Sequence, residues 1–144
     1  MPGMISCPLR RSSAHRKGTA AVELAVCLPL LMIVAVGSIE ATNAIFLKEH
    51  LTSAAYEAAR RATATVPWTS NDNPTKAAQY VLGQFGILGG IVQIVPTTVT
   101  SSTPAGTQVT VTVSAPLGSN SCMQPFIIGK AITNVGARVV MDHQ

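Results

Sequence analysis

The stretch that decides how this sequence is interpreted is Arg16-Lys17-Gly18-Thr19-Ala20-Ala21-Val22-Glu23. A basic stub ends in glycine here and leads into residues 20–39, which are almost all Ala, Val, Leu, Ile, Met, Cys or Gly. About twenty apolar residues in a helix cross a hydrocarbon core of about 30 Å. The run therefore predicts a transmembrane helix, and the junction before it is typical of a processing site.

Glu23 is the one charged residue within this run. A carboxylate near the centre of a membrane helix costs about 2.5–3.5 kcal/mol on insertion scales, and less near an interface. Such a residue usually has a function. The alternative is that Glu23 lies close enough to the cytoplasmic headgroups to remain solvated and has no special role.

The charge distribution predicts the orientation of the chain. Four of the ten basic residues precede the run, and without them six basic and six acidic residues remain, so the rest of the chain has no formal net charge. A nucleic-acid-binding domain carries its cations on its fold, so we expect no nucleic-acid partner. By the positive-inside rule the cations mark the cytoplasmic side. We expect a basic cytoplasmic leader at 1–18, a transmembrane helix at 19–42 and an extracytoplasmic domain at 43–144.

Four short motifs follow one another in order along residues 16–62. They are Gly18 with Glu23, then Leu28-Pro29-Leu30-Leu31, then Gly37-Ser38-Ile39-Glu40, and finally Ala54-Ala55-Tyr56-Glu57-Ala58-Ala59-Arg60. In this order they resemble the TadE-like family of the tight-adherence (Flp-type) pilus system. One departure is Leu24, which stands where that family often has Phe.

The resemblance implies a function and a set of site residues. It implies that a prepilin peptidase cleaves after Gly18 and leaves Thr19 as the new N-terminus, with Lys17 and Glu23 recognised during processing or assembly. By analogy with pilins, Glu23 pairs with the N-terminal amine of an adjacent subunit. The further motif positions that the resemblance singles out are Gly37, Glu40 and Arg60. Pro29 removes one backbone hydrogen bond and crowds the preceding turn, so we expect a helix kink there during extraction from the membrane.

The implied protein is a non-enzymatic minor pseudopilin or assembly factor of the bacterial inner membrane, of either the TadE or the TadF branch. Its expected partners are the inner membrane, the prepilin peptidase and other pseudopilins or pilin subunits, with no cofactor and no small-molecule substrate. An ordinary signal peptide fits less well, because the apolar run exceeds the usual length and contains Glu23. The alternative is an unprocessed, single-pass, signal-anchored protein whose extracytoplasmic domain binds something unrelated to pili.

Beyond the membrane run, the helical pattern continues to Thr63, because apolar and small residues recur at spacings of three and four. The alanines on this face allow close packing, which we expect against the protein's own domain near Ala58 and against a neighbouring subunit nearer the membrane. Glu57 precedes Arg60 and Arg61 by three and four residues, as an ion pair on the opposite face requires.

The remaining elements predict an α+β fold of the pilin-like kind, with a long N-terminal transmembrane helix, a short second helix and a small antiparallel β-sheet. Asn73 can cap the second helix, with Pro74 at its first position and Gly86 beyond its end. Val- and Thr-rich alternation predicts strands at 91–100, 107–115 and 135–141. Residues 126–132 are expected to form another short helix.

Cysteine and histidine residues give no catalytic or metal site. Cys7 lies in the leader and Cys27 in the membrane run, so Cys122 has no partner for an internal bridge and is expected to be a small buried residue. The spacing of His15, His50 and His143 matches neither a metal site nor a nucleophile with its base, so we expect solvated surface histidines.

Overall fold

The computed structural model describes residues 14–64, 73–97, 99, 103–122 and 132–143, with side chains from residue 18 onward. The chain divides into two compact units, Met1–Val36 and Gly37–Gln144. One helix, α1 (Ala14–Ala62), contributes to both units. The division after Val36 falls within the membrane helix expected at 19–42.

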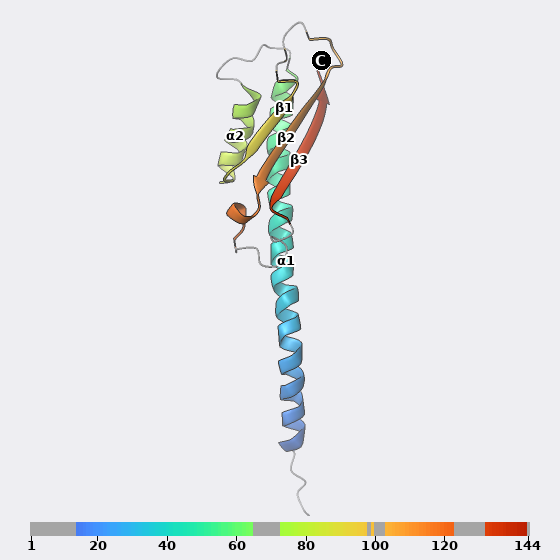
Figure 1. The fold of residues 1–144 in the computed structure, drawn as a ribbon, viewed down its shortest axis with the longest axis vertical. Helices are drawn as coiled ribbons and strands as arrows, with labels where there is room; N and C mark the ends of the chain where they lie inside the picture. The colour runs from blue at the N-terminus through green and yellow to red at the C-terminus, as the bar shows by residue number, and fades with distance from the viewer. Residues whose placement is uncertain (1–13, 65–72, 98, 100–102, 123–131, 144) are drawn as a thin grey trace, which may run out of the picture. The chain divides into compact units, whose positions relative to one another are not determined.

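The second unit combines residues 37–62 of α1 with a second helix and a sheet (Figure 1). The other elements are α2 (Pro74–Gln84), β1 (Ile91–Val95), β2 (Gln108–Pro116), the short 3-10 helix η1 (Gly118–Asn120) and β3 (Asn134–Asp142). The three strands are antiparallel in the order β1-β2-β3. This is the α+β arrangement that the sequence predicted.

The central strand β2 divides its side chains between a buried and a wetter face. Val109, Val111 and Val113 are fully buried, whereas Thr110 and Thr112 between them are only half-buried. Neighbouring strands continue the apolar face, since Val113 pairs with Val92 of β1 and Ala137 of β3. Strict alternation is what a sheet with one covered face requires.

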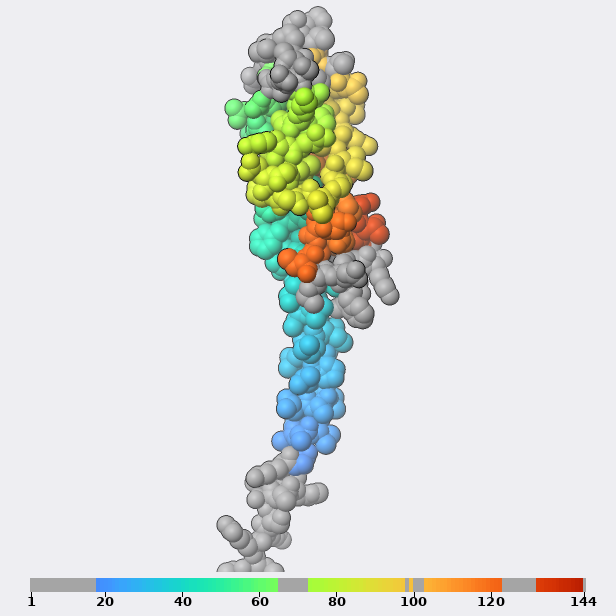
Figure 2. All heavy atoms as spheres, turned by 90° about the vertical axis from the view of Figure 1, so that its left-hand side faces the viewer, coloured from blue at the N-terminus to red at the C-terminus, as the bar shows by residue number. Residues whose placement is uncertain are grey.

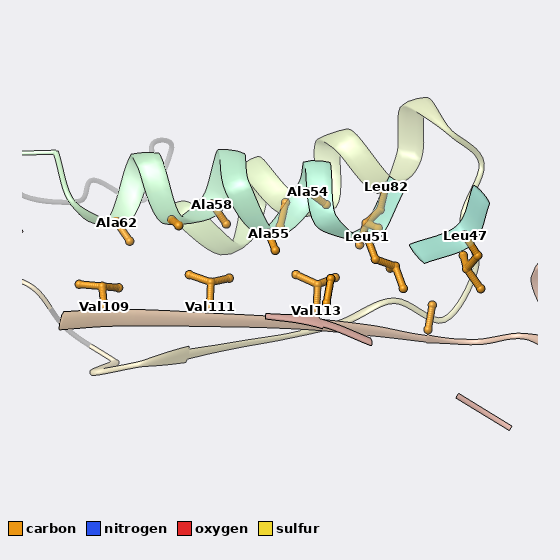
Figure 3. Close-up of a cluster of buried hydrophobic side chains, with 14 of the residues drawn as sticks. Leu47, Leu51, Ala54, Ala55, Ala58, Ala62, Leu82, Val109, Val111 and Val113 are labelled. Carbon is orange, nitrogen blue, oxygen red and sulfur yellow. The ribbon is translucent and has the colours of Figure 1, made fainter. Parts of the chain in front are cut away.

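Residues 37–62 of α1 cover the apolar face of the sheet (Figure 3). Ala54, Ala55, Ala58 and Ala62 are fully buried and lie over the valines of β2, with Leu51 beside them. Alanine side chains are short, so the helix backbone approaches the sheet closely while the valines fill the space between. The prediction that the alanine face packs against the protein's own domain near Ala58 is confirmed.

The opposite face of α1 is exposed, and its hydroxyl side chains turn back onto the helix. Three of them donate to the main-chain carbonyl four residues earlier: Thr42 to Ser38 (2.8 Å), Thr52 to Lys48 (2.8 Å) and Ser53 to Glu49 (3.1 Å). The expected ion pair also lies here: Arg61 Nε is 3.2 Å and Arg60 Nη1 is 3.9 Å from the carboxylate of Glu57. Both arginines are largely exposed, so these pairs contribute only a few tenths of a kcal/mol.

Helix α2 begins and ends as the sequence predicted. The Asn73 side chain accepts a hydrogen bond of 2.8 Å from the backbone N–H of Thr75, and Pro74 occupies the first turn. After the helix, Gly86 has a positive φ of 65°, which favours glycine. Gly90 passes so close to Leu82 of α2 that an added Cβ would lie 2.6 Å from its Cδ1 atom.

The first strand is shorter than predicted. β1 ends at Val95, and the described residues of 96–100 form no strand. Pro96 explains the difference, because proline has no N–H to donate to the ladder and its ring fixes φ. The second and third strands are confirmed, at Gln108–Pro116 and Asn134–Asp142. The helix expected at 126–132 lies outside the described residues, except for Ile132, which is not helical.

Two expectations about single residues are wrong. Cys122 is exposed rather than buried, and lies two residues beyond the end of η1. His143 is buried rather than solvated, because β3 extends to Asp142 and carries the next residue under the end of α1. His50 is half-buried and its ring stacks on Phe85, with centroids 4.0 Å apart. The side chain of His15 lies outside the described ones.

Candidate functional site: the N-terminal helix and its motif residues

Gly18 and Thr19 lie within α1, four and five residues after its first residue. A Cβ added at Gly18 would meet nothing within 4 Å, and its φ is not positive. Glycine within a helix is less favourable than alanine by about 0.5–1 kcal/mol. The described fold therefore gives no structural reason for a glycine here. The side chain of Lys17 lies outside the described ones.

The following part of α1 is an exposed apolar surface. The large side chains at positions 22–34 are each 51–72% exposed. The helix stretch Gly18–Ala62 contains an 18-residue window of mean hydropathy 2.4 in which no residue is buried. Exposed apolar surface of this extent is unfavourable in water, so lipid or another apolar surface must cover it. This helix indicates a membrane anchor.

Glu23 and Pro29 are the two residues that interrupt this surface. The Glu23 side chain is exposed, so within the described residues the fold does not shield its charge. Pro29 lacks the N–H that would bond to the carbonyl of Ala25, yet α1 continues through it as one helix. The bend at Pro29 during extraction from a membrane stays a prediction.

The motif residues of the second unit do not form one centre. Gly37 is half-buried at the first position of the unit, and Glu40 is buried, with 3% of its surface exposed. Arg60 lies about 30 Å further along the helix, at about 1.5 Å per residue, and its side chain is 73% exposed. A buried carboxylate and a distant exposed guanidinium cannot act on one substrate, so these positions have separate structural roles.

The structure also has a groove that the sequence did not reveal. It has a volume of about 830 Å³ and lies between α1 and α2, lined by Ser53, Glu57 and Arg61 on one side and by Lys76, Tyr80 and Phe85 among others on the second. Figure 2 shows the α2 side of the domain, where α2 and β1 lie next to each other at the surface.

No group of three or more His, Cys, Asp or Glu side chains that could hold a metal gathers anywhere in the described residues.

These features define a class of protein in which an apolar N-terminal helix contributes to a small α+β domain. Residues 18–60 match the family model described as TadE-like protein. The match confirms the resemblance over that segment: it begins at Gly18, includes Glu23 and Glu40, and ends at Arg60. It leaves α2 and the whole sheet outside. No curated protein and no solved structure matches this chain.

Proposed function

We propose that this protein is a minor pseudopilin or assembly factor of a tight-adherence (Flp-type) pilus. The observation that carries the proposal is the TadE-like match beginning at Gly18, on a helix whose apolar surface is exposed. The helix holds the protein in the bacterial inner membrane in a single pass. Its basic N-terminus is cytoplasmic and the α+β domain is extracytoplasmic.

The chemistry is done on this protein rather than by it. A prepilin peptidase hydrolyses the peptide bond between Gly18 and Thr19, which releases the basic leader and leaves a free amine on Thr19. Gly18 offers no side chain at the scissile bond, so the peptidase can approach the backbone closely. Lys17 contributes to recognition on the leader side.

Glu23 acts after the cut. Its carboxylate pairs with the Thr19 amine of an adjacent pseudopilin or pilin subunit, which offsets the cost of a charge in lipid. Its exposure on α1 supports this role, because the side chain is accessible to another helix. We expect Glu23→Gln to be processed normally but to enter pili poorly, measured by the amount of the protein in sheared pilus fractions.

The first test is the intact mass of the membrane-extracted protein, expressed with and without a prepilin peptidase. We expect a peptidase-dependent product that begins at Thr19. Gly18→Leu should block it, whereas Gly83→Leu is the matched control, because Gly83 is also helical and has nothing within 4 Å of an added Cβ.

An uncut chain in the presence of an active peptidase would contradict the proposal. It would favour the alternative of an unprocessed signal-anchored protein with an unrelated binding domain. Normal cutting of Gly18→Leu would also contradict the assigned processing site.

A further inference from the structure

We infer that the outer edge of β3 is a docking site for an extended segment of a partner protein. The segment pairs antiparallel with β3 around Val140, and places an acidic side chain opposite Arg138 and a basic one opposite Asp142. This inference concerns the sheet, which lies outside the TadE-like match.

The backbone of β3 has unused hydrogen-bonding groups along this edge. The N–H of His143 donates to the carbonyl of Thr107 over 2.8 Å, so this residue faces the β2 side. Backbone groups alternate in direction along an antiparallel strand, so those of Arg138, Val140 and Asp142 point the other way. Among the described residues, no strand pairs with that side of β3.

The two edges of the sheet are not equivalent. β1 has five residues, and α2 packs beside it, with Leu82 against Gly90. β3 has nine residues and forms the other edge (Figure 1). Long open edges are templates for another strand, and proteins restrict such pairing by shortening, covering or charging them. The β3 edge is the longer one and carries Arg138 and Asp142, so it can accept a strand whose charges are complementary to these two residues.

The side chains along this edge form a pattern of base, apolar residue and acid. Every second residue of β3 lies on the face of the sheet that α1 does not cover. On this face lie Arg138, Val140 and Asp142, and all three are exposed. Within the described part of the chain, neither Arg138 nor Asp142 forms an ion pair. These two opposite charges, which flank an exposed valine, form a surface that is complementary to an added fourth strand.

The charges also select the direction of the incoming strand. In antiparallel pairing around Val140, a segment with the order base, apolar, acid at alternate positions places opposite charges across both Arg138 and Asp142. The same segment in parallel register places like charges opposite each other, which is unfavourable. Main-chain hydrogen bonds then supply the affinity and these pairs supply the specificity.

The β3 strand of a second copy has the same order of side chains as the partner segment that we infer. The experiment therefore follows protection as a function of protein concentration as well as of added peptide, so that pairing between copies and pairing with a partner segment give different results.

The test uses the full chain in detergent micelles and two nine-residue peptides at millimolar concentration. One has the sequence of residues 134–142, and in the other the residues at positions 138 and 142 are exchanged. Amide hydrogen exchange is followed by NMR. The first peptide should slow exchange at Arg138, Val140 and Asp142, whereas Val139 and Met141 are already bonded to β2 and serve as internal controls. The exchanged peptide should bind at least about fivefold more weakly.

The double variant Arg138→Asp/Asp142→Arg completes the design, and its exposed positions leave the fold intact. It should prefer the exchanged peptide. Absence of protection with either peptide, or equal binding of both, would overturn the inference. Preference of the unaltered protein for the exchanged peptide would also overturn it, because that result indicates parallel pairing. So would protection of the same amides by raised protein concentration alone, because the occupant would then be a second copy.

Discussion

The Nδ1 atom of His143 lies 3.2 Å from the main-chain carbonyl oxygen of Thr63, 80 residues earlier in the chain. A carbonyl can only accept, so the hydrogen of this bond is on Nδ1. Thr63 directly follows the last residue of α1, where carbonyls lack partners within the helix. His143, the residue after β3, therefore donates a hydrogen bond to a carbonyl at the end of α1, and this bond connects the two elements.

Replacement of His143 should weaken this connection. We expect His143→Ala to lower the free energy of unfolding of the domain by about 0.5–1.5 kcal/mol, the usual contribution of one such hydrogen bond. Urea denaturation of the full chain in micelles measures it. Asp142→Ala, at the exposed neighbouring position, is the control and should change the value by less than about 0.5 kcal/mol. Equal effects of both variants would show that the imidazole contact is unimportant.

The fully buried alanines of α1 should not tolerate larger side chains. Ala58→Leu adds three carbon atoms where the helix lies directly over β2, so we expect a loss of about 1–3 kcal/mol. Thr52→Leu on the exposed face is the control and should be nearly neutral. Thermal unfolding followed by circular dichroism compares the two. An unchanged midpoint for Ala58→Leu would contradict the close packing of helix and sheet.

The contact between Gly90 and Leu82 should appear as energetic coupling. Gly90→Ala places a methyl group 2.6 Å from Leu82 Cδ1, so the leucine must move, at a cost of about 1–3 kcal/mol. In a Leu82→Ala background the same change should cost much less. A double-mutant cycle measures this difference. Gly118→Ala, where an added Cβ has open space, is the control, and additive effects in the cycle would refute the contact.

Exposure of Cys122 allows a test of membrane orientation. With the domain on the extracytoplasmic side, a membrane-impermeant maleimide should label Cys122 in intact spheroplasts. Cys122→Ser should remove the label, because Cys27 belongs to the apolar helix and Cys7 to the leader that we place in the cytoplasm. Labelling that appears only after lysis and is lost in Cys122→Ser would place the domain in the cytoplasm.

The sequence was sufficient for the elements whose cause is local. The cap formed by Asn73, the alternation along β2 and the alanine spacing on α1 all act within a few residues, and each predicted its element. The early end of β1 also had a local cause, the missing N–H of Pro96, which the Val- and Thr-rich composition obscured. The burial of His143 could not be read from the sequence, because it depends on contacts between residues far apart in the chain. The groove between α1 and α2 depends on the angle between two helices, which no local pattern encodes.

The back-bonded hydroxyl groups of α1 bear on which surroundings this helix can enter. Moving a serine or threonine out of water usually leaves a donor without a partner, at a cost of a few kcal/mol. The hydroxyl donors of Thr42, Thr52 and Ser53 already have carbonyl acceptors in their own helix. These three hydroxyl groups therefore do not depend on water for a hydrogen-bond acceptor. A shift of α1 along the membrane normal would move them between water and lipid without breaking these hydrogen bonds.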